Sequence, residues 1–214
     1  MKTYPKVVAL ASLLALSMSA SAAVPLGSKL GSFKGVYSYS NGTSGRFSSN
    51  DPINSVTVTY TEYVNGRAVA KKKTIVTGYQ WQCVEFGKRF FGLNNLYDIG
   101  SGNASEYYAK ASAKGLAAYK DGGTTLPAVG DLICWGGGSG GLGHVAIVRE
   151  VGDTYIRVIE QNRLCDSTDA DHKIGMTVTK TKDKTGKLIV SKVTVDPKGV
   201  SSKSNYWTQG WLRR

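Results

Sequence analysis

Apolar and polar residues alternate most strictly in residues 55–76. One face of this segment carries valine and tyrosine and the other carries threonine, which is the two-residue period of a strand. The pattern is interrupted at Asn65-Gly66, a dipeptide typical of a tight hairpin turn. We therefore predict a β-hairpin over residues 55–76. It forms a wall of a substrate groove or covers the core, and we assign no function to it.

A helical period follows the hairpin. Apolar residues recur at helical spacing over residues 83–91, which predicts a helix with Cys83 in its first turn. The apolar residues of segment 105–119 have the same period and end before Gly122-Gly123. A second helix is therefore predicted there.

Extended apolar segments dominate from residue 130 onward. They are residues 131–135, 144–151, 155–160, 174–180 and 188–195. The first three predict a central antiparallel sheet, and the last two predict a hairpin that turns at residues 184–186. Helices first and strands later indicate an α+β domain, with N-terminal helices packed on an antiparallel sheet that spans residues 130–195.

The first 22 residues have the pattern of a secretory signal peptide. Lys2 and Lys6 precede an apolar centre, and Ala20-Ser21-Ala22 supplies small residues for cleavage. We expect a signal peptide over residues 1–22, cleaved near Ala22, and a single secreted or periplasmic domain over residues 23–214. A retained leader that anchors the protein is the alternative. After removal of the leader no stable membrane insertion is expected, because no other stretch approaches about 20 apolar residues.

The charge of the chain favours anionic surroundings. Its formal net charge is +12, and removal of the two leader lysines leaves +10. For an exported protein, peptidoglycan or another anionic cell-wall polymer is the expected partner. Nucleic acid is not expected, because the basic residues are dispersed and form no recognition motif. We expect a monomer.

Cys83 is the first candidate for chemistry. It follows Gly78-Tyr79-Gln80-Trp81-Gln82 at the start of the predicted helix, where unpaired backbone N–H groups and the helix dipole favour thiolate over thiol. The alternative is a small buried hydrophobic residue, which free cysteines usually are. A nucleophilic cysteine needs a histidine partner elsewhere in the chain.

The chain has two histidines, His144 and His172. His144 follows the glycine-rich loop 136–143, where glycine lets the backbone turn sharply and lets a substrate chain pass close by. Glu160 and Asn162 lie two residues apart at the end of a predicted strand, so both can point toward His144. Either can hold the imidazole in the tautomer that accepts the thiol proton. The alternatives are a structural histidine and a solvated strand end.

The remaining cysteines and acidic residues predict no metal site and no cofactor. Cys134 and Cys165 either form a disulfide or leave an unpaired thiol in the core. Zinc fits poorly, because no two cysteines have the usual ligand spacing of about two to four residues. The acidic cluster of residues 166–171 lacks the pattern of a calcium loop, so a solvated loop is expected.

Four blocks of the sequence, in order and spacing, resemble the CHAP domain, the cysteine- and histidine-dependent amidohydrolase/peptidase family. They are residues 78–86, residues 127–133 (Pro-Ala-Val-Gly-Asp-Leu-Ile), residues 143–148 (Gly-His-Val-Ala-Ile-Val) and residues 159–162 (Ile-Glu-Gln-Asn). The resemblance is strongest to the glutathionylspermidine amidase branch, which shares the Trp-Gln-Cys-Val-Glu-Phe core. It implies a papain-like fold, in which the cysteine helix packs on a sheet that carries the histidine.

The resemblance also implies roles for single residues. Cys83 is expected to be the nucleophile, His144 the general base and later acid, and Glu160 the group that orients His144. Asn162 is expected to be a supporting polar residue.

By the same resemblance, Gln82 and the backbone N–H of Cys83 are candidates for an oxyanion hole, and Tyr79 is a candidate for substrate binding. The expected reaction is amide cleavage through a thioester, with peptidoglycan peptides preferred because of export and charge. Cleavage of a glutathione–polyamine amide is the competing reaction. A non-catalytic wall-binding module is the alternative from another class.

Overall fold

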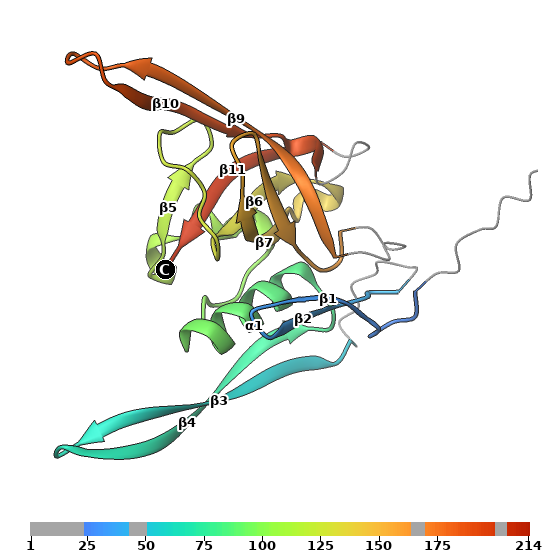
Figure 1. The fold of residues 1–214 in the computed structure, drawn as a ribbon. Helices are drawn as coiled ribbons and strands as arrows, with labels where there is room; N and C mark the ends of the chain where they lie inside the picture. Colours follow the sequence, from blue (N-terminus) through green and yellow to red (C-terminus); the bar gives the residue numbers. More distant parts are fainter. Residues whose placement is uncertain (1–23, 43–50, 164–169, 200–204) are drawn as a thin grey trace, which may run out of the picture.

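Figure 1 shows the computed structural model of this chain, which describes residues 24–42, 51–163, 170–199 and 205–214. The predicted signal peptide lies outside the described residues, as does Cys165. Cleavage of the leader and pairing of Cys134 with Cys165 therefore stay predictions.

A curled, seven-stranded antiparallel sheet forms the centre of the fold (Figure 1). Its strand order is β10-β9-β8-β7-β6-β11-β5, and each neighbouring pair is antiparallel. The strands are β5 (Ala117–Lys120), β6 (Leu132–Gly137), β7 (His144–Val151), β8 (Tyr155–Ile159), β9 (Asp171–Lys182), β10 (Leu188–Val195) and β11 (Tyr206–Arg213). The predicted antiparallel sheet is confirmed in its central strands β6, β7 and β8.

The sheet buries both of its faces, because successive side chains of a strand point to opposite sides. On β6, Leu132 and Cys134 belong to one core cluster, while Ile133 and Trp135 belong to the other. The first cluster includes the aromatic residues of the helix α1 (Cys83–Asn95). The second is completed by apolar residues of β9, β10 and β11, which the curl of the sheet brings over this face.

The helix α1 is longer than the predicted segment 83–91. It ends where Leu96 adopts the left-handed conformation, with φ 54°, and donates its backbone N–H to the Gly92 carbonyl. Gly87 allows a close approach to the sheet, since a Cβ there would lie 3.1 Å from Leu132 Cδ1. The N-terminal half of α1 therefore lies against Leu132 of β6 and Val145 of β7.

The predicted helix over residues 105–119 is wrong. The structure has the short helix α2 (Ala104–Tyr107), the 3₁₀ turn η1 (Ser112–Lys114) and then β5. Gly115, with φ 61°, ends the 3₁₀ turn, and the following residues pair with β11. Pairing at the sheet edge overrides the weak helical preference of this segment. The described fold is therefore richer in strand than the predicted arrangement of N-terminal helices on a sheet.

The predicted sheet of residues 130–195 lacks β11. Its pattern is interrupted by Gly210, where the pairing register with β6 also shifts. Gly210 has φ 146°, and a Cβ there would lie 2.1 Å from the Tyr119 carbonyl oxygen. This glycine marks a close approach between two backbones, which a pattern of apolar residues does not reveal.

Two further hairpins complete the structure. β1 (Lys29–Phe33) pairs with β2 (Val36–Tyr39), and β3 (Ile53–Val64) pairs with β4 (Arg67–Tyr79). The second hairpin turns at Asn65-Gly66, both with positive φ, and its distal half projects from the body of the protein (Figure 1). Its proximal half packs against α1. The short 3₁₀ helix η2 (Ser139–Gly141) lies between β6 and β7 in the sequence, and η3 (Pro197–Gly199) lies between β10 and β11.

The glycine-rich loop has a packing role. A Cβ at Gly136 would lie 2.4 Å from the Trp207 ring, and one at Gly138 would lie 2.6 Å from the Tyr206 ring. Aromatic rings of β11 occupy the space beside these two glycines. The predicted passage for a substrate chain is therefore wrong at these positions.

Gly143 sets the start of β7, and its replacement tests how tightly this start is constrained. Gly143 has φ 74°, and a Cβ there would lie 2.5 Å from both Ser105 N and Trp135 O. We expect Gly143→Ala to lower the free energy of unfolding by about 2 to 5 kcal/mol, because the left-handed backbone and the clash both oppose a side chain. Urea unfolding measures this change.

Gly141→Ala is the matched control. Gly141 has φ 69° and no neighbour within 4 Å of a Cβ, so only the backbone penalty of about 1 to 2 kcal/mol applies. Equal losses for the two variants would contradict the close packing at Gly143.

Candidate active site

Cys83 is the first residue of α1, preceded by Gln82 as the N-cap in an extended conformation. Its side chain is largely buried, with 9% of the residue exposed. The backbone N–H groups of Val84 and Val145 lower the pKa of its thiol. The sulfur therefore lies where the helix end and the start of β7 both present donors to an anion.

His144 opens β7 and lies beside this thiol. The imidazole hydrogen-bonds to Cys83, and its Nε2 lies 2.6 Å from Glu160 Oε2. Trp135, its partner in the register of β6 and β7, packs against the imidazole with ring centroids 5.9 Å apart. The structure thus brings Cys83, His144 and Glu160 into one buried line, with Nδ1 of His144 left for the thiol.

Glu160 follows directly after β8. Its backbone N–H donates to the Ala170 carbonyl over 3.0 Å, and its own carbonyl accepts a hydrogen bond from the buried hydroxyl of Ser38. Its carboxylate is 2% exposed. Backbone bonds to two other segments therefore fix the residue while both carboxylate oxygens face protein groups.

Burial and charge act in opposite directions on the pKa values of this site. Burial alone would raise the pKa of the Cys83 thiol, but the charge and hydrogen bond of His144 hold that pKa below its ordinary value of 9.0. Burial alone would lower the pKa of His144, but Glu160 and the thiolate raise it to about 10. Cys83 and His144 are therefore stabilised as a thiolate and an imidazolium.

The side chain of Asn162 does not point toward His144, as that of Glu160 does. Asn162 lies beyond the end of β8 with φ 57°, so the two-residue period of a strand no longer applies there. Its Nδ2 donates to Gln82 Oε1 over 2.7 Å. The prediction that Asn162 faces His144 is therefore wrong, and the residue holds the side chain of Gln82, next to Cys83, instead.

Gln82 and Tyr79 lie in the turn that leads into α1. Gln82 Nε2 is buried and makes no hydrogen bond within the described part of the chain. Tyr79 ends β4, and its carbonyl accepts a hydrogen bond from the Gln82 N–H over 3.1 Å. The structure thus gives Gln82 a donor without a partner and gives the Tyr79 backbone a role in shaping the turn.

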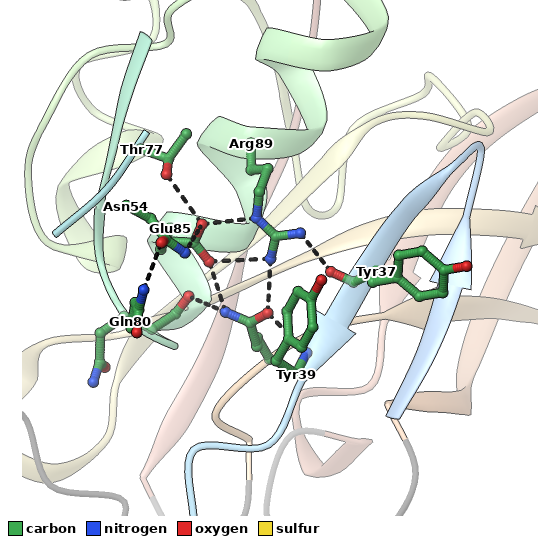
Figure 2. Close-up of polar contacts among 9 residues, drawn as sticks. Tyr37, Tyr39, Asn54, Thr77, Gln80, Glu85 and Arg89 are labelled. Atoms are coloured by element: carbon green, nitrogen blue, oxygen red, sulfur yellow. Dashed lines mark hydrogen bonds and ion pairs between the residues drawn. The ribbon is translucent and has the colours of Figure 1, made fainter. Parts of the chain in front are cut away.

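A buried ion pair lies under this turn (Figure 2). Glu85 and Arg89, one helical turn apart on α1, are joined by bonds of 2.7 and 3.1 Å. Glu85 Oε1 also accepts hydrogen bonds from Thr77 on β4 and from Asn54 on β3. Arg89 donates to the Tyr37 carbonyl on β2. The pair therefore connects the helix to both N-terminal hairpins.

Gln161 joins this network to the segment that carries Glu160. Its Nε2 donates to Glu85 Oε2 over 2.8 Å and to the Gln82 carbonyl over 3.2 Å. Its Oε1 accepts from Arg89 and from the Tyr39 N–H. Gln161 thus ties the residue after Glu160 to the residue before Cys83.

Sequence reasoning missed these supporting residues. The four-residue spacing of Glu85 and Arg89 on a predicted helix is a signal that indicates a pair, but nothing local shows that the pair is buried. Gln161 and His172 carry no such signal, because their partners lie far away in the sequence. His172 Nδ1 lies 2.9 Å from Glu160 Oε1.

Among the residues that the structure describes, no group of three or more histidine, cysteine, aspartate or glutamate side chains is arranged to hold a metal ion. Within the same residues, no helix is both long and apolar enough to cross a membrane.

Residues 74–162 match the model of the CHAP domain family. The match covers less than half of the chain. The CHAP family comprises amidases and peptidases, so this similarity points to a hydrolase that acts on amide bonds. The CHAP segment contains Cys83, His144 and Glu160, whereas His172 lies beyond it.

Curated relatives of this chain have names that refer to glutathionylspermidine. The bifunctional glutathionylspermidine synthetase/amidases of Escherichia coli K12 and Shigella flexneri are each 33% identical over 96 residues, which cover 40% of this chain and 16% of the relative. The glutathionylspermidine synthase of Crithidia fasciculata is 30% identical over 149 residues, which cover 60% of this chain and 20% of the relative. The chain thus spans a fifth or less of the length of these relatives.

The role of the buried ion pair between Glu85 and Arg89 can be tested by removing its cation. We expect Arg89→Met to lower the free energy of unfolding by about 3 to 5 kcal/mol, because the carboxylate of Glu85 would stay buried without its partner. The double variant Glu85→Gln with Arg89→Met is expected to lose less than Arg89→Met alone. Urea unfolding of the single and double variants measures both losses.

Lys110→Met is the matched control, since Lys110 and Glu106 form a pair with the same four-residue spacing and a bond of 2.8 Å on the surface. Its loss is expected to be small, because solvent screens an exposed pair. A loss as large as that of Arg89→Met would contradict the assigned role of burial.

The pKa shifts predict how Cys83 responds to pH. Its rate of alkylation by iodoacetamide is expected to stay high below pH 9.0, the ordinary pKa of a thiol, and to fall on the acid side as the thiolate gains a proton. In His144→Ala the fall is expected at higher pH, because burial then acts without the opposing charge. Mass spectrometry of the labelled peptide measures the rate, with Cys83→Ala as the blank. The same profile in wild type and His144→Ala would contradict the pair.

Proposed function

We propose that this protein is a secreted cysteine amidohydrolase or peptidase that cleaves peptide amides of peptidoglycan through a thioester. The observation that carries the proposal is the buried group of three side chains in which Cys83 is hydrogen-bonded to His144 and His144 Nε2 lies 2.6 Å from Glu160 Oε2. In this proposal Cys83 is the nucleophile, His144 is the general base and acid, and Glu160 orients the imidazole.

The reaction follows from the ionised pair. The thiolate of Cys83 attacks the carbonyl carbon of the amide, and the electron pair of the carbonyl bond moves to oxygen. As the tetrahedral intermediate collapses, the C–N bond breaks and the amine leaves with the proton of the His144 imidazolium. The neutral imidazole then takes a proton from water, which attacks the thioester and breaks the C–S bond. The acid leaves and the thiolate is restored.

Gln82 supports this reaction as an oxyanion donor. Its Oε1 is held by Asn162 over 2.7 Å, so the amide has a fixed orientation and its buried Nε2 has no partner among the described residues. We propose that Nε2 and the backbone N–H of Cys83 bind the oxyanion, a role worth about 3 kcal/mol per donor. Tyr79 is proposed to contact the substrate from the same turn. The packing of α1 on the strand that starts with His144 also supports a papain-like fold.

The proposed substrate rests on location and charge. We propose that residues 1–22 are a cleaved leader, that residues 23–214 act as one domain, and that this domain works outside the cytoplasm as a monomer. A mature chain of net charge +10 attracts anionic wall polymers. The same charge repels a polycation such as spermidine, which is a physical reason to rank the wall polymer first.

A glutathionylspermidine-type amidase is the second candidate. It is favoured by the names of the curated relatives, which are a glutathionylspermidine synthase and two bifunctional synthetase/amidases. A non-catalytic wall-binding module is the third candidate. It gives no reason for a buried thiolate beside an aligned histidine and glutamate.

Two assays on the mature protein decide between these functions. We expect turbidity loss of purified peptidoglycan with wild-type protein, and a fall in rate of at least about a thousandfold with Cys83→Ala, because the nucleophile is gone. Release of amine from glutathionylspermidine is measured in parallel. Mass spectrometry of the peptidoglycan products identifies the bond that is cut.

Cys134→Ala is the matched control, because Cys134 is a buried cysteine of β6 outside the site. It is expected to keep most of the activity. Amine release without turbidity loss would select the second candidate. Cleavage of neither substrate, or full activity of Cys83→Ala, would contradict the proposed mechanism.

A further inference from the structure

Glu160 has a second histidine neighbour, on the strand beside its own. His172 lies on β9, opposite Val158 of β8, and its Nδ1 is 2.9 Å from Glu160 Oε1. The other carboxylate oxygen, Oε2, is the one that contacts His144. The two histidines therefore hold different oxygens of the same carboxylate.

The carboxylate of Glu160 needs partners on both oxygens, because it is 2% exposed and a buried charge without hydrogen bonds is costly. Besides His172, Arg163 approaches Oε1, with its Nε at 3.4 Å. The ionisable groups that act on Glu160 or on its partners come from several elements: Cys83 on α1, His144 on β7, Arg163 after β8, His172 on β9 and Tyr206 on β11.

The contact between His172 and Glu160 has the distance of a hydrogen bond without its alignment. Neither His172 Nδ1 nor Glu160 Oε1 makes an aligned hydrogen bond within the described part of the chain. The contact supports the charge of Glu160 all the same, since His172 acts with His144 to hold the pKa of this buried carboxyl below its ordinary value. A small rotation of the ring would align the N–H with Oε1, and catalytic contacts often tighten in this way when substrate binds.

We propose that His172 is a positioning residue, which donates from Nδ1 to Glu160 Oε1 and so keeps Oε2 directed at His144. The proposal rests on the proposed function of Cys83, His144 and Glu160. Without His172, Glu160 holds the imidazolium of His144 less strongly. The thiolate of Cys83 is then less favoured on the acid side, although His172 touches neither Cys83 nor the reacting atoms.

Two substitutions at His172 separate the donor from the rest of the side chain. His172→Asn keeps an N–H donor near the position of Nδ1, whereas His172→Leu fills similar space without a donor. Lys173→Leu is the matched control on β9, because Lys173 points to the other side of the strand and stacks over the Tyr155 ring. Thermal unfolding confirms that each variant is folded before its chemistry is measured.

The first readout is the pH profile of Cys83 alkylation by iodoacetamide, with Cys83→Ala as the blank. In His172→Leu we expect the acid limb to move to higher pH by about one unit, which is a tenfold slower reaction at a given pH on that limb. In His172→Asn and Lys173→Leu the limb is expected to move by less than about a third of a unit. The second readout is hydrolysis, where His172→Leu should lower kcat about tenfold with little change in KM.

The outcomes keep this proposal distinct from the proposed function. A wild-type alkylation profile that does not depend on His144 would overturn the catalytic pair itself. A profile that depends on His144 but is the same in wild type and His172→Leu would overturn the role of His172 alone. If His172→Leu does not fold, His172→Asn still tests the proposal. An acid limb shifted by a full unit in that folded variant would contradict the proposal that His172 acts by donating a hydrogen bond from Nδ1. A shift in Arg163→Gln without one in His172→Leu would transfer the role to Arg163.

Discussion

The buried ion pair of Glu85 and Arg89 is the interaction on which the rest of the structure depends. Its two charges lie on one turn of α1 with side chains at most 8% exposed, so the pair stabilises the fold only if its remaining oxygens and N–H groups find partners. Those partners come from the backbone of β2, from β3, from β4 and from the segment after β8. Satisfying one buried pair therefore holds four separate segments together beneath the turn that carries Cys83.

The chemistry of the site is a consequence of this scaffold. A largely buried thiol would ordinarily be a poor nucleophile, because burial raises its pKa. Here the helix end and the imidazole of His144 oppose that effect, and Glu160 raises the pKa of His144 and so keeps that imidazole charged. Gln161 is the clearest example, since one amide bonds to the ion pair and to the Gln82 carbonyl. The contacts that pack the segments at this site therefore also position its charged groups.

Local pattern was a good guide where local forces decide. The helix that starts at Cys83, the hairpin at Asn65-Gly66 and the strand that starts at His144 all depend on period, turn chemistry and glycine. Pattern failed where a distant backbone decides. Residues 117–120 form a strand because they pair with the edge of β11. Asn162 does not point toward His144 because it lies beyond the end of β8 in the left-handed conformation.

The sequence by itself indicated Cys83, His144 and Glu160 as candidates, because periodicity places them at the start of a helix or at the start or end of a strand, and the resemblance to the CHAP family assigns their expected roles. Only the tertiary structure decided how these groups are charged. The pKa values of Cys83 and His144 depend on burial and on charges brought from other strands, and the second contact of Glu160 comes from β9. The physical reason is the range of the interactions. The periodic patterns of helices and strands depend on residues close together in the sequence, whereas desolvation and Coulomb interactions depend on distance in space.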